Sequence, residues 1–391
     1  MPSFFDFILL QRFKKWFNPA DEQTAYQQNR GCADHVFFLR CLTQHAKRYK
    51  KKLFLIAIDF DGAFDKVSRS HLIRKLCLFG AGTVFTACLA SISMCTDNVI
   101  FRGLSHASYK LYSGIKQGSP LSPFLFFFYI DDVFNFLGKI YDGGRNVLDK
   151  LHVPIHADDA TVIARDREGA ICKLESMIDY CNQNFILSQY TKCEFLAVNG
   201  NNVDCSPLPF GGKILNNVVH IFLLGSHITS NASVKDEMKL HMKLRHKSVI
   251  KFYNFIRSNK LSPLSVKLKV LKSCVISSIL YNCETFGDYV PKDIDSTYTK
   301  MLKCCFNARS NISNDILFIE SGFLPIKAII LMRQFKFYKR FCKSIKNGSR
   351  REKMFNILLT EETNFIQHYK RLSSRYSCIE DIANEYKNEI K

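Results

Sequence analysis

Two neighbouring carboxylates between apolar runs are the residues of this sequence whose chemistry is easiest to predict. The stretch from Leu151 to Ala164 reads LHVPIHADDATVIA, so Asp158 and Asp159 follow one alternating apolar segment and precede another. This pattern predicts two short strands joined by a tight turn, with both acids at its tip. Adjacent carboxylates repel each other and resist burial, so such a pair between core strands implies a neutralising cation, with Mg²⁺ the first choice.

A third acid stands at the end of an equally apolar run. Asp59 belongs to Leu53–Phe60, LFLIAIDF, which is followed by Asp61-Gly62 and a helical pattern that ends before Gly80. Asp59 is therefore expected at the carboxyl end of a strand, where ligand sites of mixed sheets often lie. It is the candidate third carboxylate that two bridging metal ions would need. We interpret Asp61 and Asp65 as acids at a helix start that complement its dipole.

A glycine-rich loop lies between these two acidic segments. The stretch Gly114–Phe126 reads GIKQGSPLSPFLF, and its glycines 114 and 118 permit unusual dihedral angles and close backbone approach. Gln117 between them is placed to contact a nucleotide or a template base, although a Gly/Pro loop by itself usually indicates only a turn. The acids on the helix that follows this loop, Asp131 and Asp132, are predicted to form a solvated helical face rather than a second metal site.

Composition indicates the class of partner. The 391 residues are 47% hydrophobic and 23% charged, as in folded proteins, and could form two or three domains. A net charge of +20 predicts a polyanionic partner, with nucleic acid favoured over a membrane surface because no single amphipathic helix carries the charge. The longest apolar run, Leu121–Ile130, is too short to span a bilayer. The 15 cysteines show no zinc spacing, which predicts reduced thiols in the nucleus or cytoplasm without disulfides or structural zinc.

The remaining segments predict the elements that position these residues. Phe4–Phe17 reads as an amphipathic helix, and a second helix is expected around residues 36–46. After the acid pair we predict a helix at 170–186, a strand at 193–198 directly preceded by Lys192, a loop at 199–212 and a hairpin within 218–229. Lys192 is close enough in sequence to the acids to meet a triphosphate or to give a proton to leaving pyrophosphate, although an exposed lysine is most often only solvated.

Beyond Ser233 the pattern is helical and basic. Lysines and arginines cluster in Lys235–Lys272 and again in Arg333–Lys346, with apolar residues such as Leu244 expected on the buried faces. Cations on consecutive helices with few acids suggest a surface that tracks phosphates.

Taken together, the motifs resemble the reverse transcriptases of LINE-type, non-LTR retrotransposons. The family's first acid motif is similar to AIDFDGAFDKV (57–67), its nucleotide loop to GIKQGSPLSPFLF, and its Y/F-A-D-D hairpin to HADD (156–159). Three further stretches match in order: TKCEF (191–195), the primer-grip-like LLGSHIT (223–229) and ILYNCETFG (279–287), which is followed by NDILFIESGFLPI. The likeness covers about residues 29–345, and several motifs in the right order make it specific.

The resemblance implies an α+β fold of the right-hand polymerase type. We expect partial fingers and N-terminal helices in residues 1–52, and a palm of antiparallel sheet with packed helices, together with remaining fingers elements, in 53–232. An all-α basic thumb would follow in 233–300, and a basic C-terminal helical region in 301–391.

The implied function is RNA-directed DNA polymerisation from deoxynucleoside triphosphates onto a primer 3′-hydroxyl. Asp59, Asp158 and Asp159 would be the catalytic ligands of two Mg²⁺ ions, with Mn²⁺ as a substitute, and Lys192 would act at the triphosphate or pyrophosphate. Substrate binding would involve Phe64 under the incoming sugar and Gln117 with Gly118 at the nucleotide. The expected partners are an RNA template, a DNA primer and the triphosphates, with no membrane.

Two departures from the family pattern leave a second interpretation open. His156 stands where the family has Tyr or Phe, and QQNRGCADHVF (27–37) resembles the middle of the fingers with little before it. On this basis the upstream fingers and an endonuclease domain are expected to be missing. The alternative is a catalytically weak or inactive nucleic-acid-binding remnant of such an element.

Overall fold

The computed structural model forms two compact units that interleave along the sequence. It describes residues 4–83, 85–87, 89, 96–97, 100–101, 104–105, 109–110, 113–138, 153–345, 352 and 364–390. The first unit joins residues 1–27 to 52–218, and the second joins 28–51 to 219–391. Leu151 and His152, at the start of the segment with the acid pair, lie outside the described residues. The four-segment division expected from the sequence stays a prediction.

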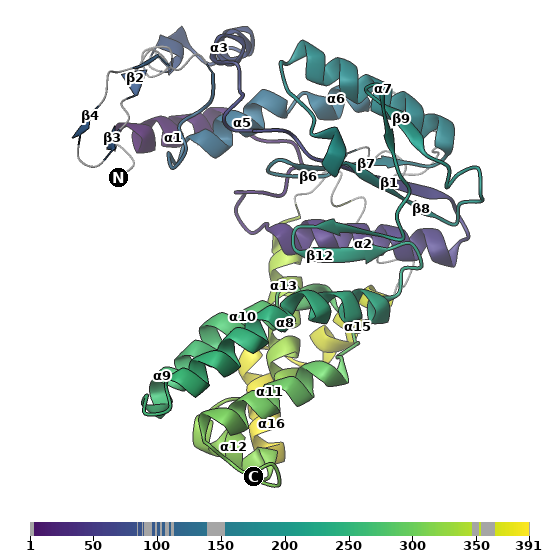
Figure 1. Ribbon diagram of the computed structural model, residues 1–391. Helices are drawn as coiled ribbons and strands as arrows, with labels where there is room; N and C mark the ends of the chain where they lie inside the picture. Colours follow the sequence, from purple (N-terminus) through teal and green to yellow (C-terminus); the bar gives the residue numbers. More distant parts are fainter. Residues whose placement is uncertain are drawn as a thin grey trace. The chain divides into compact units, whose positions relative to one another are not determined.

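An antiparallel sheet is the centre of the first unit (Figure 1). Its four strands lie in the order β6-β7-β1-β8, and every neighbouring pair is antiparallel. The strands are β6 (Ile155–His156), β7 (Asp159–Ala164), β1 (Leu53–Ile58) and β8 (Glu194–Val198). The apolar runs around the candidate acids therefore pair with each other in one sheet.

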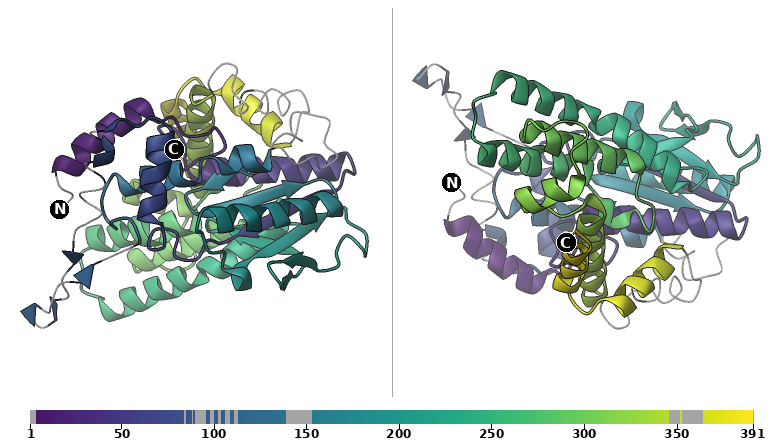
Figure 2. Two further views of the ribbon diagram at one scale, coloured as in Figure 1. Left: turned by 90° about the horizontal axis from the view of Figure 1, so that it is seen from above. Right: turned by 90° about the horizontal axis from the view of Figure 1, so that it is seen from below.

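The alternation along β1 sorts its side chains onto two faces. Phe54, Ile56 and Ile58 pack into a large core with residues of the helices that cover the sheet, while Leu55 and Ala57 point to the other face. The helix α7 (Arg167–Gln183) lies across the sheet in the view from above (Figure 2), with its N-terminus capped by the side chain of Asp166, which accepts from Gly169 N–H. Asp59 follows Ile58 and so continues the face of Ala57.

The other elements of this unit surround the sheet and its first connection. The helices are α1 (Phe4–Trp16), α3 (Arg69–Leu78), α5 (Ser122–Ile130), α6 (Val133–Leu137) and the 3₁₀ turn η2 (Tyr190–Lys192). The short strands are β2 (Thr96–Asp97), β3 (Ile100–Phe101), β4 (Leu104–Ser105), β5 (Tyr109–Lys110), β9 (Leu208–Phe210) and β10 (Lys213–Leu215). The prediction of a continuous loop over 199–212 was wrong, because Leu208 and Phe210 alternate inward and form a hairpin with β10 across Gly211 and Gly212.

The prediction of a solvated face at Asp131 and Asp132 was also wrong. Lys75 Nζ, on a buried side chain, contacts both carboxylate oxygens of Asp132 at 2.8 and 3.0 Å, and the Tyr180 hydroxyl donates to the same group at 2.5 Å. Asp131 accepts a hydrogen bond from the backbone N–H of Ala20 at 2.9 Å. The two acids are therefore structural anchors, which local periodicity could not show because their partners lie far away in sequence.

Among the residues that the structure describes, the second unit is helical apart from one hairpin. Its helices are α2 (Cys32–Arg48), α8 (Val234–Ser258), α9 (Leu264–Val270), the π-helical η3 (Leu271–Ile276), α10 (Ser277–Ile279), η4 (Cys283–Thr285), α11 (Lys292–Cys305), α12 (Asn314–Ser321), α13 (Ile326–Lys343), α15 (Asn364–Arg375) and α16 (Ile379–Ile390). The hairpin strands are β11 (His220–Leu223) and β12 (Ser226–Thr229). Leu224 and Gly225 both have positive φ, as a two-residue hairpin loop requires. Two apolar cores hold this unit, one around α8, η3 and α11 and the other where aromatic residues of α2, α13 and α15 meet.

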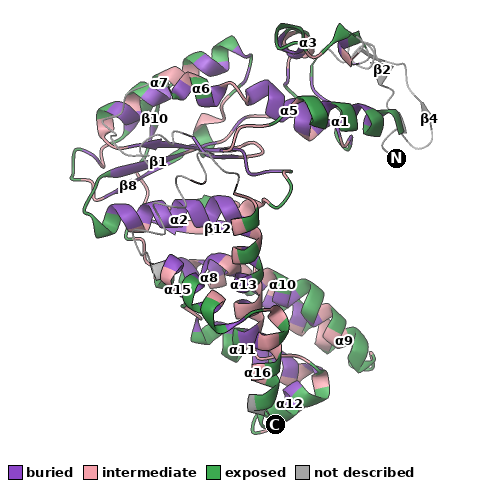
Figure 3. Cartoon of the chain, turned by 180° about the vertical axis from the view of Figure 1, so that it is seen from behind, coloured by how far each residue is buried: buried purple, intermediate pink, exposed green. Residues whose placement is uncertain are grey.

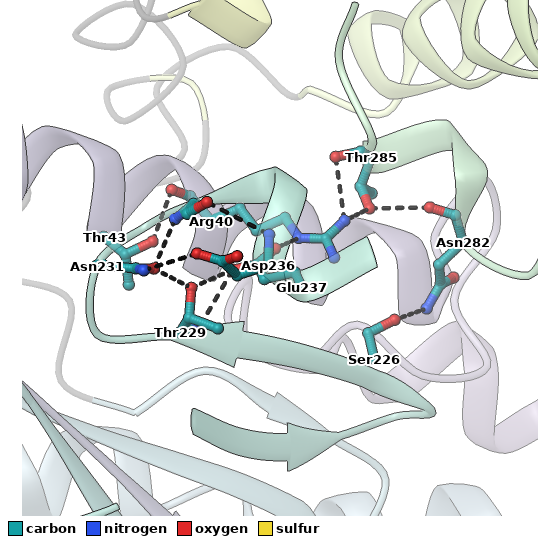
Figure 4. Close-up of polar contacts among 10 residues, drawn as sticks. Arg40, Thr43, Ser226, Thr229, Asn231, Asp236, Glu237, Asn282 and Thr285 are labelled. Atoms are coloured by element: carbon teal, nitrogen blue, oxygen red, sulfur yellow. Dashed lines mark hydrogen bonds and ion pairs between the residues drawn. The ribbon is translucent and has the colours of Figure 1, made fainter. Parts of the chain in front are cut away.

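Helix α2 is buried along nearly its whole length (Figure 3), including Val36, Leu39, Leu42 and Ala46, the residues that predicted it. It also carries a charge into the interior. Arg40 Nε lies 2.7 Å from Glu237 Oε2, and both side chains are almost fully buried. Figure 4 shows the Arg40 guanidinium between Glu237 and Thr285. The guanidinium donates a hydrogen bond to the backbone carbonyl of Thr285 at 3.1 Å. Glu237 in turn accepts from the backbone N–H of Thr229, at the end of β12, at 3.1 Å. This network ties three separate segments of the second unit together.

No described helix has the length and apolar character needed to cross a membrane. The cysteines that the structure describes are free thiols.

Candidate active site

Strand register brings the candidate catalytic residues of the first unit together. Ile58 pairs with Ala160 on β7, and Ala57 pairs with Glu194 on β8. Extending the pairing of β1 with β7 by one residue sets Asp59 opposite Asp159. On the other side Lys192 lies in the turn η2, and its Nζ approaches Asp59 Oδ2 to 3.4 Å. Directly opposed residues of an antiparallel pair project from the same face. Three residues that are distant in sequence are therefore neighbours at one edge of the sheet.

Asp158 lies in the turn that was predicted for both acids, and Asp159 is the first residue of β7. His156 pairs with Asp159, which leaves Ala157 and Asp158 as a two-residue hairpin loop. Burial, and secondarily the charges of Asp158 and Asp59, raise the pKa of Asp159 to about 6. The carboxylates are therefore close enough to repel one another electrostatically. A cation among them would remove that repulsion.

Lys192 provides one positive charge. Its Nζ lies 3.4 Å from Asp59 Oδ2, and the lysine side chain is 64% exposed. The chain segment before it runs beside β1, since Asp61 N–H donates to Leu187 O at 2.7 Å and Gln189 N–H donates to Asp59 O at 2.8 Å. The lysine is thus held at the acids by backbone pairing, while its ammonium group remains accessible to a substrate.

The donor chemistry at this edge fits a hard divalent cation, because carboxylate oxygens are the ligands that Mg²⁺ prefers. In the described part of the chain, however, no three or more His, Cys, Asp or Glu side chains converge closely enough to hold a metal ion. Asp59 is turned to Lys192 instead. The residue types therefore fit a metal, provided that Asp59 exchanges its lysine partner for the ion.

The glycine loop packs against the segment that follows Asp59. Gly114 N–H donates to Val67 O at 2.8 Å, and Ile115 N–H donates to Phe64 O at 2.9 Å. A Cβ on Gly114 would lie 2.7 Å from Asp65 O, so only glycine fits there. The close backbone approach expected of this loop is thus present at Gly114. At Gly118 the backbone has φ +84° with open space around it.

The residues predicted to bind the nucleotide lie near this loop. The Phe64 ring is partly buried and packs on the Phe126 ring, with the ring centroids 5.1 Å apart. Gln117 is exposed, and its Nε2 donates to Asp65 Oδ1 at 2.6 Å. Asp65 therefore orients Gln117. The interpretation of Asp61 and Asp65 as helix-start acids was wrong, because α3 begins at Arg69 and has no acid in its first turn.

Some residues that shape the site were not anticipated from the sequence. Arg69 Nε donates to Gly114 O at 2.7 Å and so fixes the glycine loop from α3. Gln23 and Thr24 contact the acid hairpin from a segment with no periodic pattern. None of these three contacts has a local sequence signal, because the two partners of each contact lie far apart in the chain.

The basic helix α8 of the second unit presents lysines at intervals of four residues. Lys235, Lys239, Lys243, Lys247 and Lys251 are all exposed. Arg245 instead donates to Gly225 O at 2.9 Å and lies over the Tyr281 ring at 5.1 Å, so it supports the hairpin. The prediction that Leu244 is buried was wrong, since its side chain is 40% exposed. The predicted segment that continues to Lys346 is helical as far as Lys343, and Lys346 lies outside the described residues.

Comparison with known proteins identifies the family. Residues 8–252, more than half of the chain, match the model of the family described as reverse transcriptase (RNA-dependent DNA polymerase). The chain belongs to the reverse transcriptase family. The matched range contains Asp59, Asp158, Asp159 and Lys192.

Curated relatives of this reverse transcriptase are retrotransposon proteins, as the sequence resemblance predicted. It is 24% identical over 200 residues, 49% of its length, to the Retrovirus-related Pol polyprotein from type-2 retrotransposable element R2DM of Drosophila melanogaster. It is 27% identical over 165 residues, 41% of its length, to the Pol polyprotein from type-1 retrotransposable element R2 of Bradysia coprophila. Each alignment covers 18% of the relative, so the chain spans less than a fifth of the proteins it matches.

Solved structures of two telomerases, each in complex with a fragment of telomeric RNA, align with this reverse transcriptase over most of its length. The Candida tropicalis structure covers 91% of this chain and 56% of its own, with 12% identity and a TM-score of 0.42. The Candida albicans structure covers 92% and 56%, with 14% identity and a TM-score of 0.40. These scores are too low to carry an argument, so the family assignment rests on the sequence match.

Proposed function

We propose that this chain is the RNA-directed DNA polymerase part of a non-LTR retrotransposon protein and that its active site lies at the sheet edge formed by Asp59, Asp158 and Asp159. The observation that carries the proposal is the strand register that sets Asp59 opposite Asp159, together with the contact of 3.4 Å between Asp59 Oδ2 and Lys192 Nζ. Three carboxylates and one cation at a single edge suit a reaction that needs metal ions and a polyanionic substrate. Membership of the reverse transcriptase family supports the same reaction.

The three carboxylates would hold divalent ions, Mg²⁺ or Mn²⁺. When bound there, such ions would lower the pKa of a primer 3′-hydroxyl and neutralise charge on the triphosphate. Asp59 would then exchange its contact with Lys192 for one with the ion. The released lysine, mostly exposed and attached to a turn that backbone pairing holds in place, would be free to bind the phosphates or to protonate the pyrophosphate oxygen.

Other residues of the same unit would orient the nucleotide. Phe64 would lie beneath the sugar, since its ring is held by Phe126 and its backbone by the glycine loop. Gln117, exposed and oriented by Asp65, would contact the nucleotide beside the backbone of Gly118. Misplacing reacting atoms by about 1 Å can reduce a rate roughly a hundredfold, so this support matters to the rate.

The second unit would bind the nucleic acid, an RNA template paired with a DNA primer. The exposed lysine row of α8 could track one phosphate backbone, because phosphate contacts by lysine and arginine supply most of the sequence-independent affinity. The hairpin β11–β12, which resembles a primer grip, would be held in place by Glu237 at Thr229 and by Asn282 Nδ2, which donates to Ser226 Oγ at 2.8 Å. In the right-hand description, the first unit would contain the palm and the second the thumb.

Primer extension on the full chain tests this proposal. The assay would supply an RNA template, a labelled DNA primer, deoxynucleotides and Mg²⁺. Asp158→Ala should reduce extension by at least about a hundredfold, because one metal contact is lost, while primer–template affinity stays within about twofold. Extension that persists in Asp158→Ala would refute the assignment. If the unmodified chain binds duplex with steep salt dependence and never extends it, the remnant interpretation is favoured instead.

A further inference from the structure

The hairpin that carries Asp158 and Asp159 has an unusual backbone. Ala157, the residue just before Asp158, has φ +59°, although it is not a glycine. A left-handed conformation is unfavourable for a residue with a Cβ, and it persists only where surrounding contacts enforce it. A two-residue hairpin loop favours positive φ at its first residue, so the turn geometry and the contacts around it together hold Ala157 in this conformation.

Residues 22–24 of the first unit pair with the strand before this turn. Gln23 forms a parallel bridge with Ile155. Ile155 N–H donates to Glu22 O at 3.1 Å, and Thr24 N–H donates to Ile155 O at 2.9 Å. This segment therefore covers the open edge of β6, a strand of only two residues.

Two side chains of the segment reach the turn itself. Gln23 is 1% exposed, and its Oε1 accepts a hydrogen bond from Ala157 N–H at 3.1 Å and another from Ala25 N–H at 3.0 Å. The Thr24 hydroxyl is hydrogen-bonded to His156 Nδ1 at 2.9 Å. The strained residue thus has its own amide held by a buried amide side chain 134 positions away in sequence.

We propose that Gln23 is a positioning residue for the catalytic acids, which acts by holding Ala157 in its left-handed conformation so that Asp158 and Asp159 face Asp59. This inference rests on the proposed function. Without the Gln23 acceptor, the turn would relax to conformations in which the carboxylates diverge, and only a fraction of molecules would be competent to bind metal. Apparent metal affinity falls in proportion to that fraction, so a competent population of one tenth gives about a tenfold weaker affinity.

The probe is Mn²⁺, titrated into the full chain and followed by the electron paramagnetic resonance signal of the free ion. Gln23→Met removes the acceptor at nearly constant volume, and we expect about tenfold weaker binding. Gln27→Met is the matched control, because Gln27 Nε2 donates only to backbone carbonyls of its own segment, to Gln23 O at 2.6 Å and to Ala20 O at 3.5 Å. It should bind Mn²⁺ as the unmodified chain does. Asp158→Ala identifies the acids as the binding site.

The substitution Ala157→Gly tests whether the loss of affinity comes from the conformation of the turn. Adding Ala157→Gly to Gln23→Met should recover most of the lost affinity, because glycine adopts positive φ without the Cβ penalty. If Gln23→Met merely loosened residues 20–27, adding Ala157→Gly would not recover the Mn²⁺ affinity. A loss that glycine fails to recover, or a Gln23→Met chain that binds as tightly as the control, overturns the inference.

Hydrogen exchange of the peptide that contains residues 153–164 gives a readout independent of metal. Faster exchange in Gln23→Met, with the Gln27→Met control unchanged, supports the inference that Gln23 holds the turn. Equal exchange in all variants refutes it. If the unmodified chain binds no Mn²⁺ at the acids, the proposed metal site fails. The exchange result then still decides whether Gln23 holds the turn.

Discussion

Two glycines of one loop should respond very differently to the same substitution. Gly114 and Gly118 have nearly equal dihedral angles, φ +86° and +84°, so an alanine at either position meets the same left-handed penalty of about 1–2 kcal/mol. They differ in the space around them. A Cβ on Gly114 would lie 2.7 Å from Asp65 O, a backbone atom that cannot rotate away, whereas a Cβ on Gly118 meets nothing within 4 Å.

The expected magnitudes follow from this difference. Gly118→Ala should lower the free energy of unfolding of the first unit by about 1–2 kcal/mol. Gly114→Ala should lower it by that amount and by a further ~1–3 kcal/mol for the forced backbone shift. The shift would also move Phe64, whose carbonyl accepts from Ile115, and Gln117. The KM for deoxynucleotides should therefore rise strongly in Gly114→Ala, with primer–template affinity unchanged.

The assay combines urea denaturation with steady-state primer extension at varied deoxynucleotide concentration. Gly118→Ala is the matched control for backbone conformation, since it changes the same atoms at the same φ. Equal destabilisation by the two alanines would refute the argument from the Asp65 contact. An unchanged KM in a clearly destabilised Gly114→Ala chain would show that the loop does not place the nucleotide.

Two further predictions concern the sugar and the neighbouring acids Asp131 and Asp132. Phe64→Ala should admit ribonucleotides, because the ring is expected to fill the space of a 2′-hydroxyl; an unchanged ratio of deoxyribonucleotide to ribonucleotide incorporation would remove Phe64 from the site. Burial raises the pKa of Asp131 from 3.8 to about 6. The charged form of Asp131 is therefore disfavoured in the folded chain. The resulting destabilisation is absent below about pH 4 and complete above about pH 6. It reaches at most about 3 kcal/mol, at ~1.4 kcal/mol per pKa unit. Asp131→Asn should stabilise the chain at pH 8 but not at pH 4 in urea denaturation, whereas Asp132→Asn should destabilise it at pH 8, because Lys75 loses its charged partner; a pH-independent effect of Asp131→Asn would contradict the burial argument.

The sequence predicted the elements around the candidate site best where a local apolar pattern and an acidic residue coincide. An apolar run that ends in an acid predicted the strand that ends just before Asp59, and an acid pair between alternating segments predicted the hairpin that turns at Asp158. Local pattern says nothing about which strands become neighbours. The pairing of Gln23 with Ile155, and the contacts of Asp132 with Lys75 and Tyr180, depend on residues far apart in the chain. The hairpin at 208–215 was missed because its Pro and Gly content is also typical of a loop.

The interleaving of the two units has a consequence for synthesis on the ribosome. Helix α2 emerges early, yet Thr285, which accepts from Arg40, is 245 residues further along the chain, and Arg340, which contacts Asp34, is 306 residues away. At about 5–20 residues per second, α2 would wait roughly 10–60 s for these partners, while the whole sheet of the first unit is completed in between. During that interval its aromatic face and its arginine have no native partners from the C-terminal helices. The nascent chain is therefore open to chaperones, or to misassembly between neighbouring copies, for longer than a protein whose units are continuous in sequence.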